Sequence, residues 1–299
     1  PVFLIIFLGI FLKKINIIDE IFVKISSRLV FSVALPALVF TKLYAMDFQQ
    51  ALDFKQILFI YCGILFFYGL IWFTSIPFIT EGRDRAVFIQ GSFRSNYAII
   101  GFAVIQNMFG EHALVKASVI LAFIMPLYNF LSIVALTVPV RKEKGLNLTK
   151  TVIEIFTNPL ILAALISIIF SYFKIPVHPV ILKTGNYLAA MALPLALIDI
   201  GGSLNLKNIS RLAIITTFIK LILIPSLLTF GAYRLGYRGE DLVLMFLLFA
   251  TPTAIASFIM AEAMDCNGQL ASDIVVISTL TSILTISVGI FILKSLKLF

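Results

Sequence analysis

The chain has 299 residues, of which 61% are hydrophobic and 13% charged, and its mean hydropathy is +1.08. This balance leaves too little polar surface to cover a soluble globule of that size, so it excludes a soluble protein and indicates an integral membrane protein. The formal net charge of +8 falls mostly in connections between apolar runs, where Lys and Arg favour the cytoplasmic side, and it requires no nucleic-acid partner.

Apolar runs of about 20 residues recur along the whole chain, and each is long enough to cross a hydrocarbon core of about 30 Å. Strict alternation of polar and apolar residues is absent, which favours helices over a β-barrel. We predict an all-α membrane fold of ten transmembrane helices: up to about 12, then 23–43, 54–79, 86–109, 115–140, 152–173, 180–204, 209–233, 242–264 and 270–293. Because the numbering opens without a Met, we expect the first helix to begin before Pro1.

The two halves of the chain resemble each other. The longest polar connection, 141–147, divides the chain into two five-helix repeats, residues 1–150 and 151–299. Pro36 aligns with Pro194 at an offset of 158 (194 − 36), and a nearby offset of 156 lays 95–99 on 251–255. Because each half holds an odd number of helices, the copies insert in opposite orientations, which predicts the inverted repeat typical of secondary transporters.

Polar residues interrupt the fourth and ninth predicted helices at equivalent places. In the ninth, Thr251 followed by Pro252 is typical of an N-cap and first helical position, and Ser95 with Asn96 offers caps for a second half-helix in the fourth. The sequence therefore predicts two broken, crossing helices. Their N-termini would approach from opposite sides and present free N–H groups and positive dipole ends, an arrangement that attracts anions.

Arg94 is the charge beside the first interruption. An arginine at bilayer depth costs roughly 2.5–3.5 kcal/mol, so it indicates a functional site that faces protein or water. It could bind a carboxylate through two hydrogen bonds, or only neutralise the carbonyl end of the preceding half-helix. For the capping residues the alternative is capping without ligand contact. The candidate substrate-binding residues are Gln90, Arg94, Ser95, Asn96, Thr251, Pro252 and Thr253.

Three further charges fall within predicted helices: Asp199, Lys220 and Glu262. Lys220 is either a structural counter-ion for broken-helix carbonyls or part of a proton-coupling switch. Asp199 or Glu262 could titrate as the coupling site, and the alternative for both is an interfacial or salt-bridged carboxylate. The two Cys and two His lack metal-ligand spacing, so we expect no catalytic residue, metal or cofactor apart from a coupling ion, H⁺ or Na⁺.

Several short motifs, in order along nearly the whole chain, resemble those of a bacterial member of the auxin efflux carrier family. They are Gly91-Ser92-Phe93-Arg94-Ser95-Asn96 with Gly101, Asn158-Pro159-Leu160-Ile161, Met191-Ala192-Leu193-Pro194 with Gly201, Lys220 with Pro225, and Ala271-Ser272 with Ser278-Thr279-Leu280. The chain departs from the family at Ala103, where a proline often follows the fourth-helix glycine.

The resemblance implies a fold related to bile-acid symporters and sodium/proton antiporters. Helices one, two, six and seven would form a scaffold that often dimerises, and the others a mobile core that moves as an elevator. Bacterial members are commonly assigned malate-type organic anions, and plant relatives export auxin. We therefore expect a multi-pass secondary transporter of a small organic anion in the cell membrane.

Two alternatives stay open: a cation/proton antiporter of the same fold, and a membrane sensor or channel that binds an anion without carrying it. Lys and Arg modestly favour the loops after odd-numbered helices, which predicts both termini outside the cytoplasm.

Overall fold

The computed structural model describes residues 2–45, 53–143, 153, 157, 159–203 and 209–299. In these ranges every regular element is a helix, apart from one isolated β-bridge. The first half contains α1 (Val2–Lys14), α2 (Glu20–Leu29), the π-helical turn η1 (Val30–Ala34), α3 (Leu35–Tyr44), α4 (Phe54–Ser75), α5 (Gly82–Phe93), the π-helical turn η2 (Tyr97–Gly101), α6 (Phe102–Phe109) and α7 (Glu111–Glu143).

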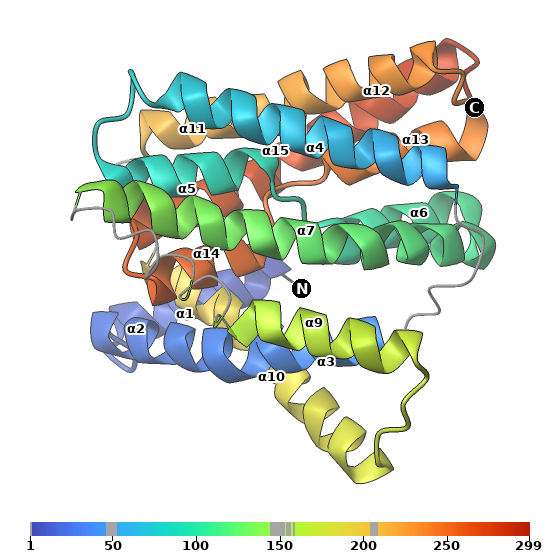
Figure 1. Cartoon of the computed structure of the whole chain (residues 1–299). Helices are drawn as coiled ribbons and strands as arrows, with labels where there is room; N and C mark the ends of the chain where they lie inside the picture. The colour runs from blue at the N-terminus through green and yellow to red at the C-terminus, as the bar shows by residue number, and fades with distance from the viewer. Residues whose placement is uncertain (1, 46–52, 144–152, 154–156, 158, 204–208) are drawn as a thin grey trace.

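The second half contains α9 (Pro159–Tyr172), α10 (Pro179–Ser203), α11 (Arg211–Phe218), the π-helical turn η3 (Ile219–Leu223), α12 (Ile224–Arg234), α13 (Gly239–Ala250), α14 (Ile255–Ala263) and α15 (Gly268–Ser295). Figure 1 shows the helices in two groups, with α1, α2, α3, α9 and α10 in one group and α4 to α7, α11, α12, α13 and α15 in the other. Most of them run roughly parallel, whereas α10 crosses its group at an angle. Helix α14 lies between the groups and packs on both α2 and α10.

The buried apolar residues form two cores. Phe67 on α4, Ile124 on α7 and Leu247 on α13 are buried in one core, while Leu197 on α10 and Phe258 on α14 are buried in the other. The second core also contains Ile133 of α7 and Ile274 of α15, so it crosses from one group of helices to the other.

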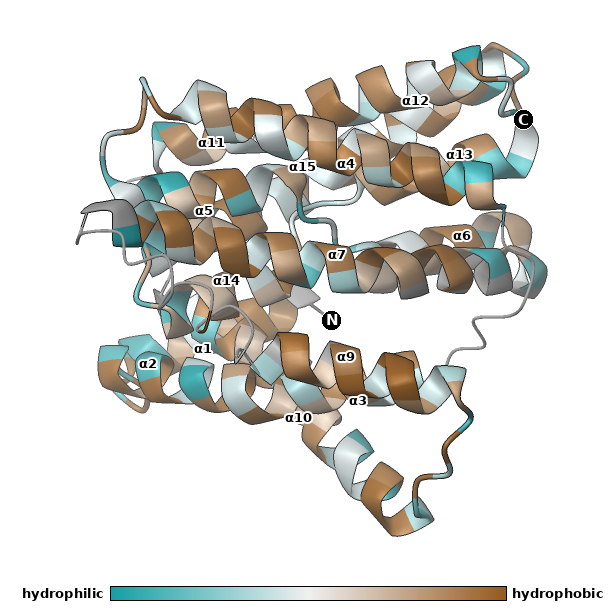
Figure 2. Cartoon of the chain, in the orientation of Figure 1, coloured by the Kyte–Doolittle hydropathy of each residue, from teal (hydrophilic) through white to brown (hydrophobic). Residues whose placement is uncertain are grey.

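Six helical segments are long and apolar enough to cross a membrane. They are Glu20–Tyr44, Phe54–Ser75, Val119–Arg141, Pro179–Gly202, Arg211–Arg234 and Gly268–Ser295. Hydrophobic residues dominate these segments along most of their length (Figure 2). Large apolar side chains also remain exposed on outer faces, for example Leu4, Phe66, Leu165, Phe230 and Phe291. An outer surface of this kind matches lipid rather than water, so the chain is a multi-pass, all-helical membrane protein.

The two predicted helices 86–109 and 242–264 are each divided. Helix α5 ends at Phe93 and is followed, after a short extended stretch, by η2 and α6; helix α13 ends at Ala250 and α14 begins at Ile255. Helices α13 and α14 contain 12 and 9 residues, too few for either helix to cross a bilayer alone.

Helices α1 and α10 touch backbone to backbone. A Cβ atom built on Gly201 would lie 2.2 Å from the carbonyl oxygen of Ile6, and one on Gly9 would lie 2.4 Å from that of Ile198. Such distances exclude any side chain at either position. Small residues at helix interfaces in membranes permit this close approach, which maximises van der Waals contact where lipid supplies no hydrophobic driving force.

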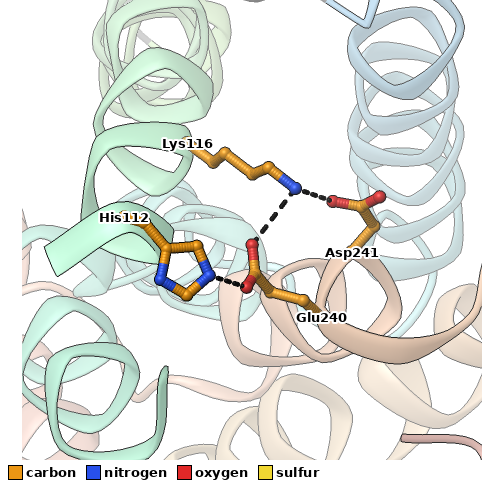
Figure 3. A network of polar contacts seen from close by, with 4 residues as sticks. All are labelled: His112, Lys116, Glu240 and Asp241. Carbon is orange, nitrogen blue, oxygen red and sulfur yellow. Dashed lines mark hydrogen bonds and ion pairs between the residues drawn. The ribbon is translucent and has the colours of Figure 1, made fainter. Parts of the chain in front are cut away.

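A network of polar and charged side chains joins the first two turns of α7 to the first turn of α13 (Figure 3). Lys116 contacts Glu240 at 3.2 Å and Asp241 at 3.3 Å, and the Nε2 atom of His112 lies 2.5 Å from the Glu240 carboxylate. The hydrogen bond to Glu240 raises the pKa of Lys116 above its usual value, and the negative charge of Asp241 adds to this effect. Partial burial opposes the shift. This network ties together two helices of the same group at one end.

Candidate functional site

The interruptions after α5 and after α13 pair with each other. Both helices end in residues with extended backbone angles: Arg94 (φ −75°, ψ 127°) and Thr251 (φ −65°, ψ 147°). The backbone N–H of Asn96 donates to the carbonyl of Pro252 at 2.8 Å, and Ser95 and Thr253 form an antiparallel bridge. Two segments more than 150 residues apart therefore meet as a short two-stranded contact inside a helical protein.

The prediction that Thr251 caps the start of a new helix was wrong. Thr251 is the C-cap of α13, while α14 begins at Ile255 with Ala254 as its N-cap and no side-chain cap. The physical reason is that Pro252, Thr253 and Ala254 remain extended, because they pair with the other interruption instead of starting a helix. The hydroxyl of Ser95 likewise accepts hydrogen bonds from Lys220 and Tyr128, so it is occupied by partners from other helices.

The polar side chains at the crossing satisfy the carbonyl ends of the half-helices. Thr253 donates its hydroxyl to the Gly91 carbonyl in the last turn of α5 at 2.7 Å. Lys220, from η3, donates to the Phe249 carbonyl in the last turn of α13 at 2.7 Å and to the Ser95 hydroxyl at 2.6 Å. A cation near a helix C-terminus also stabilises the negative end of the helix dipole. Lys220 thus contacts both interruptions at once.

Arg94 is buried and extends toward α7 and α14. Its guanidinium donates to the Ser132 hydroxyl at 2.8 Å, to the Asn129 side-chain oxygen at 2.9 Å and to the Met260 sulfur at 2.9 Å. These partners are all neutral. The residue itself is 8% exposed, so the charge is largely removed from solvent.

Two buried cations therefore lie at the crossing without acidic partners. Within the part of the chain that the structure describes, neither Arg94 nor Lys220 forms a salt bridge. A gap beside the crossing, too narrow for a water molecule, is lined by Gln90, Thr253 and Ser257 among others. The Gln90 side-chain oxygen and the Ser257 hydroxyl are buried without a hydrogen-bond partner. Buried charge without a counter-ion and unsatisfied polar atoms are costly, so they mark the crossing as a candidate functional site.

Known proteins share sequence similarity with nearly the whole chain. The family model described as "Membrane transport protein" matches residues 1–290. The chain belongs to this membrane transport protein family. It is the auxin efflux carrier family that the sequence motifs resemble.

Several relatives match this chain over nearly its full length. A protein of Methanothermobacter thermautotrophicus is 24% identical over 95% of this chain and 94% of its own length. One of Methanocaldococcus jannaschii is 23% identical over 98% of this chain and 96% of its own, and YfdV of Escherichia coli is 24% identical over 98% and 95%. Each is named as an uncharacterized transporter. The family and these relatives identify a membrane transporter.

In the structure of this chain, the candidate site residues proposed from the sequence lie together, with two exceptions. Gln90, Arg94, Ser95, Asn96, Thr251, Pro252, Thr253 and Lys220 are all at the crossing or in the adjoining helix ends. Asp199 forms its hydrogen bonds elsewhere, with Ser26 and Ser27 on α2, and Glu262 lies toward the far end of α14. Substrate binding by the first group stays a prediction.

Sequence reasoning missed the partners on α7. Tyr128, Asn129 and Ser132 contact Ser95 or Arg94, yet none was singled out. A signal was present, because Asn129 and Ser132 are three residues apart in a strongly apolar helix and so share one polar face. Ser278, which accepts a hydrogen bond from the Thr253 backbone, was part of a family motif but was not proposed as a site residue, and Met260, which contacts Arg94, carried no signal.

Proposed function

We propose that this transporter is a secondary carrier of a small organic anion such as a malate-like or auxin-like carboxylate. The observation that carries the proposal is the pair of buried cations, Arg94 and Lys220, next to paired helix breaks and without acidic partners among the described residues. A carboxylate would supply the missing negative charge. It would also replace the neutral partners of Arg94 with a charge-assisted, two-point contact.

The local geometry favours binding between the half-helices. Both η2 and α14 begin next to the crossing, so the positive ends of their dipoles add to the side-chain charges. The unpartnered Gln90 oxygen and Ser257 hydroxyl lie along the adjoining gap and would accommodate further polar groups of a ligand. Because the gap is closed here, we propose that entry requires the surrounding helices to move.

We further propose a 5+5 inverted repeat, residues 1–150 and 151–299, that works by an elevator motion. Helices α1, α2, α3, α9 and α10 would be the scaffold and the remaining helices the moving core. One of the two apolar cores lies wholly among the proposed moving helices, which supports their motion as a packed unit. In this arrangement both termini face away from the cytoplasm.

The exposed apolar face of α10, which includes Val180, Ile181 and Tyr187, supports a homodimer through the scaffold.

The deciding experiment replaces Arg94 and measures malate transport in proteoliposomes. Arg94→Ala should abolish counterflow of labelled malate, and Arg94→Lys should retain part of it, because lysine keeps the charge but not the two-point geometry. A thermal unfolding curve must show that each variant folds. Unchanged counterflow in a folded Arg94→Ala protein would remove Arg94 from the site.

A matched control is Arg234→Ala. Arg234 is basic and lies at the end of α12, over the ring of Phe230 and away from the crossing. This variant should transport malate at the wild-type rate. If wild-type protein binds malate saturably but shows no counterflow, the anion-binding sensor becomes the better description. If neither malate nor an auxin-like acid binds, the anion proposal fails for both classes.

A further inference from the structure

Asp199 is a fully buried carboxylate that the anion site does not use. It lies near the C-terminal end of α10. The hydroxyl of Ser26 is 2.8 Å from each of its two carboxylate oxygens, and the hydroxyl of Ser27 is 3.1 Å from Oδ2. Both serines belong to α2 and are themselves buried. Three polar side chains thus meet at the contact between α2 and α10.

No cation balances Asp199 within the described part of the chain. The charged groups on the elements that pack against α10 are Lys13 and Lys14 on α1, Glu20, Lys24 and Arg28 on α2, Lys42 on α3, Glu262 on α14, and Asp273 and Lys294 on α15. Of the basic residues, Lys24 and Arg28 pair instead with Asp265, at 3.0 and 3.6 Å. Glu262 is the charged neighbour that acts on Asp199 through space, and it too is acidic.

An ionised carboxylate in this setting would be costly. Two hydroxyl hydrogen bonds do not replace the hydration of a full charge, and a nearby acid adds repulsion. A neutral carboxylic acid fits the geometry, since its own O–H can donate to one serine while the other serine donates to it.

We propose that Asp199 is a proton-binding site, protonated while α14 packs on α2 and α10 as it does here and releasing its proton when α14 moves away from them. The role of this proton in coupling rests on the proposed transport function. Helix α14 packs on both α2 and α10, so its displacement admits water to Asp199. Glu262, and then Asp265 in the following loop, lie in sequence toward the surface and provide carboxylates through which the proton can leave.

Infrared difference spectroscopy tests the proton site without any substrate. Wild-type protein in lipid vesicles at neutral pH should show the carbonyl band of a protonated carboxylic acid, which Asp199→Asn removes and the control Asp273→Asn retains. Asp273 is a suitable control because it is also a buried carboxylate, on α15, which packs against α10. Its hydrogen-bond partners are different, namely Gln269 and the Ser210 backbone. Identical spectra for the wild type and Asp199→Asn overturn the proposal.

A second variant keeps the test decisive if Asp199→Asn does not fold. Ser27→Ala removes one hydrogen bond but leaves the acid, so the same band should persist at a shifted frequency. If the frequency of the band is the same in Ser27→Ala as in the wild type, the band belongs to another acid and the assignment to Asp199 fails.

Coupling is measured separately, with labelled malate. Asp199→Asn should lose accumulation driven by a pH gradient, down to the equilibrium level, while malate counterflow persists. Gradient-driven accumulation that survives in Asp199→Asn overturns the coupling role. If wild-type protein moves no malate, the proposed function fails on this probe, whereas the infrared result still decides the proton site.

Discussion

Thr253 donates its hydroxyl to the carbonyl oxygen of Gly91 across 2.7 Å, although the two residues are 162 positions apart. The bond connects the interruption after α13 to the last turn of α5. It satisfies a carbonyl that the helix itself leaves without a partner, so one side chain stabilises the end of one broken helix from within the break of the other.

Thr253→Val should destabilise the protein. Valine keeps the shape of threonine but leaves the buried Gly91 carbonyl without this donor, at a cost of about 1–3 kcal/mol. Thermal unfolding in detergent should therefore show a lower Tm. Thr253→Ser is the matched control, because it preserves the hydroxyl and should recover most of the loss. Equal Tm values for the valine and serine variants would show that the hydrogen bond contributes nothing.

Lys220→Met should separate structural from binding roles of the buried ammonium. The change removes hydrogen bonds to Ser95 and Phe249, but it also removes the cost of burying a charge without an acidic partner, so we expect little change in Tm. Malate affinity should fall at least tenfold, since one charge-assisted hydrogen bond contributes about 1.5–3 kcal/mol. The measurement is a malate binding isotherm. A large drop in Tm with unchanged affinity would assign Lys220 a purely structural role.

Gly201→Ala should disrupt the contact between α1 and α10. The new Cβ would lie 2.2 Å from the Ile6 carbonyl oxygen and 2.9 Å from the Gly9 Cα, and backbone atoms cannot move aside as a side chain can. Overpacking of this kind typically costs about 1–3 kcal/mol. Gly69→Ala on α4 is the control, because no atom lies within 4 Å of its Cβ position. It should be neutral or slightly stabilising. Similar Tm values for the two variants would refute the close-contact argument.

Lys116→Met should lower stability in a pH-dependent way. Because Glu240 raises the pKa of Lys116, the contribution of the ion pair is fully present below the ordinary lysine pKa of about 10.4 and is lost as pH rises through the raised value. The lysine side chain is 47% exposed, so the difference from wild type should not exceed about 1 kcal/mol. Urea unfolding at neutral and strongly alkaline pH should show the difference narrowing. A constant difference would mean that packing, not charge, is responsible.

Sequence reasoning anticipated the local character of most elements. The predicted helix 54–79 corresponds to α4, and the interruptions in 86–109 and 242–264 are where α5 and α13 end. Polar residues inside an apolar run signalled those positions directly. The capping assignment of Thr251 was wrong for a different reason: a threonine before a proline suits a helix start locally, but pairing with the other interruption kept the segment extended.

The amino-acid sequence by itself determined that the chain is a helical membrane protein and that the charges of Arg94 and Lys220 required partners. Both conclusions follow from residue type alone, which sets the hydropathy and the cost of burying a charge. Only the tertiary structure decided which partners they have. Asn129, Ser132 and Met260 surround Arg94, and two serines of α2 hold Asp199, because helices distant in sequence pack together and bring those groups within hydrogen-bond distance.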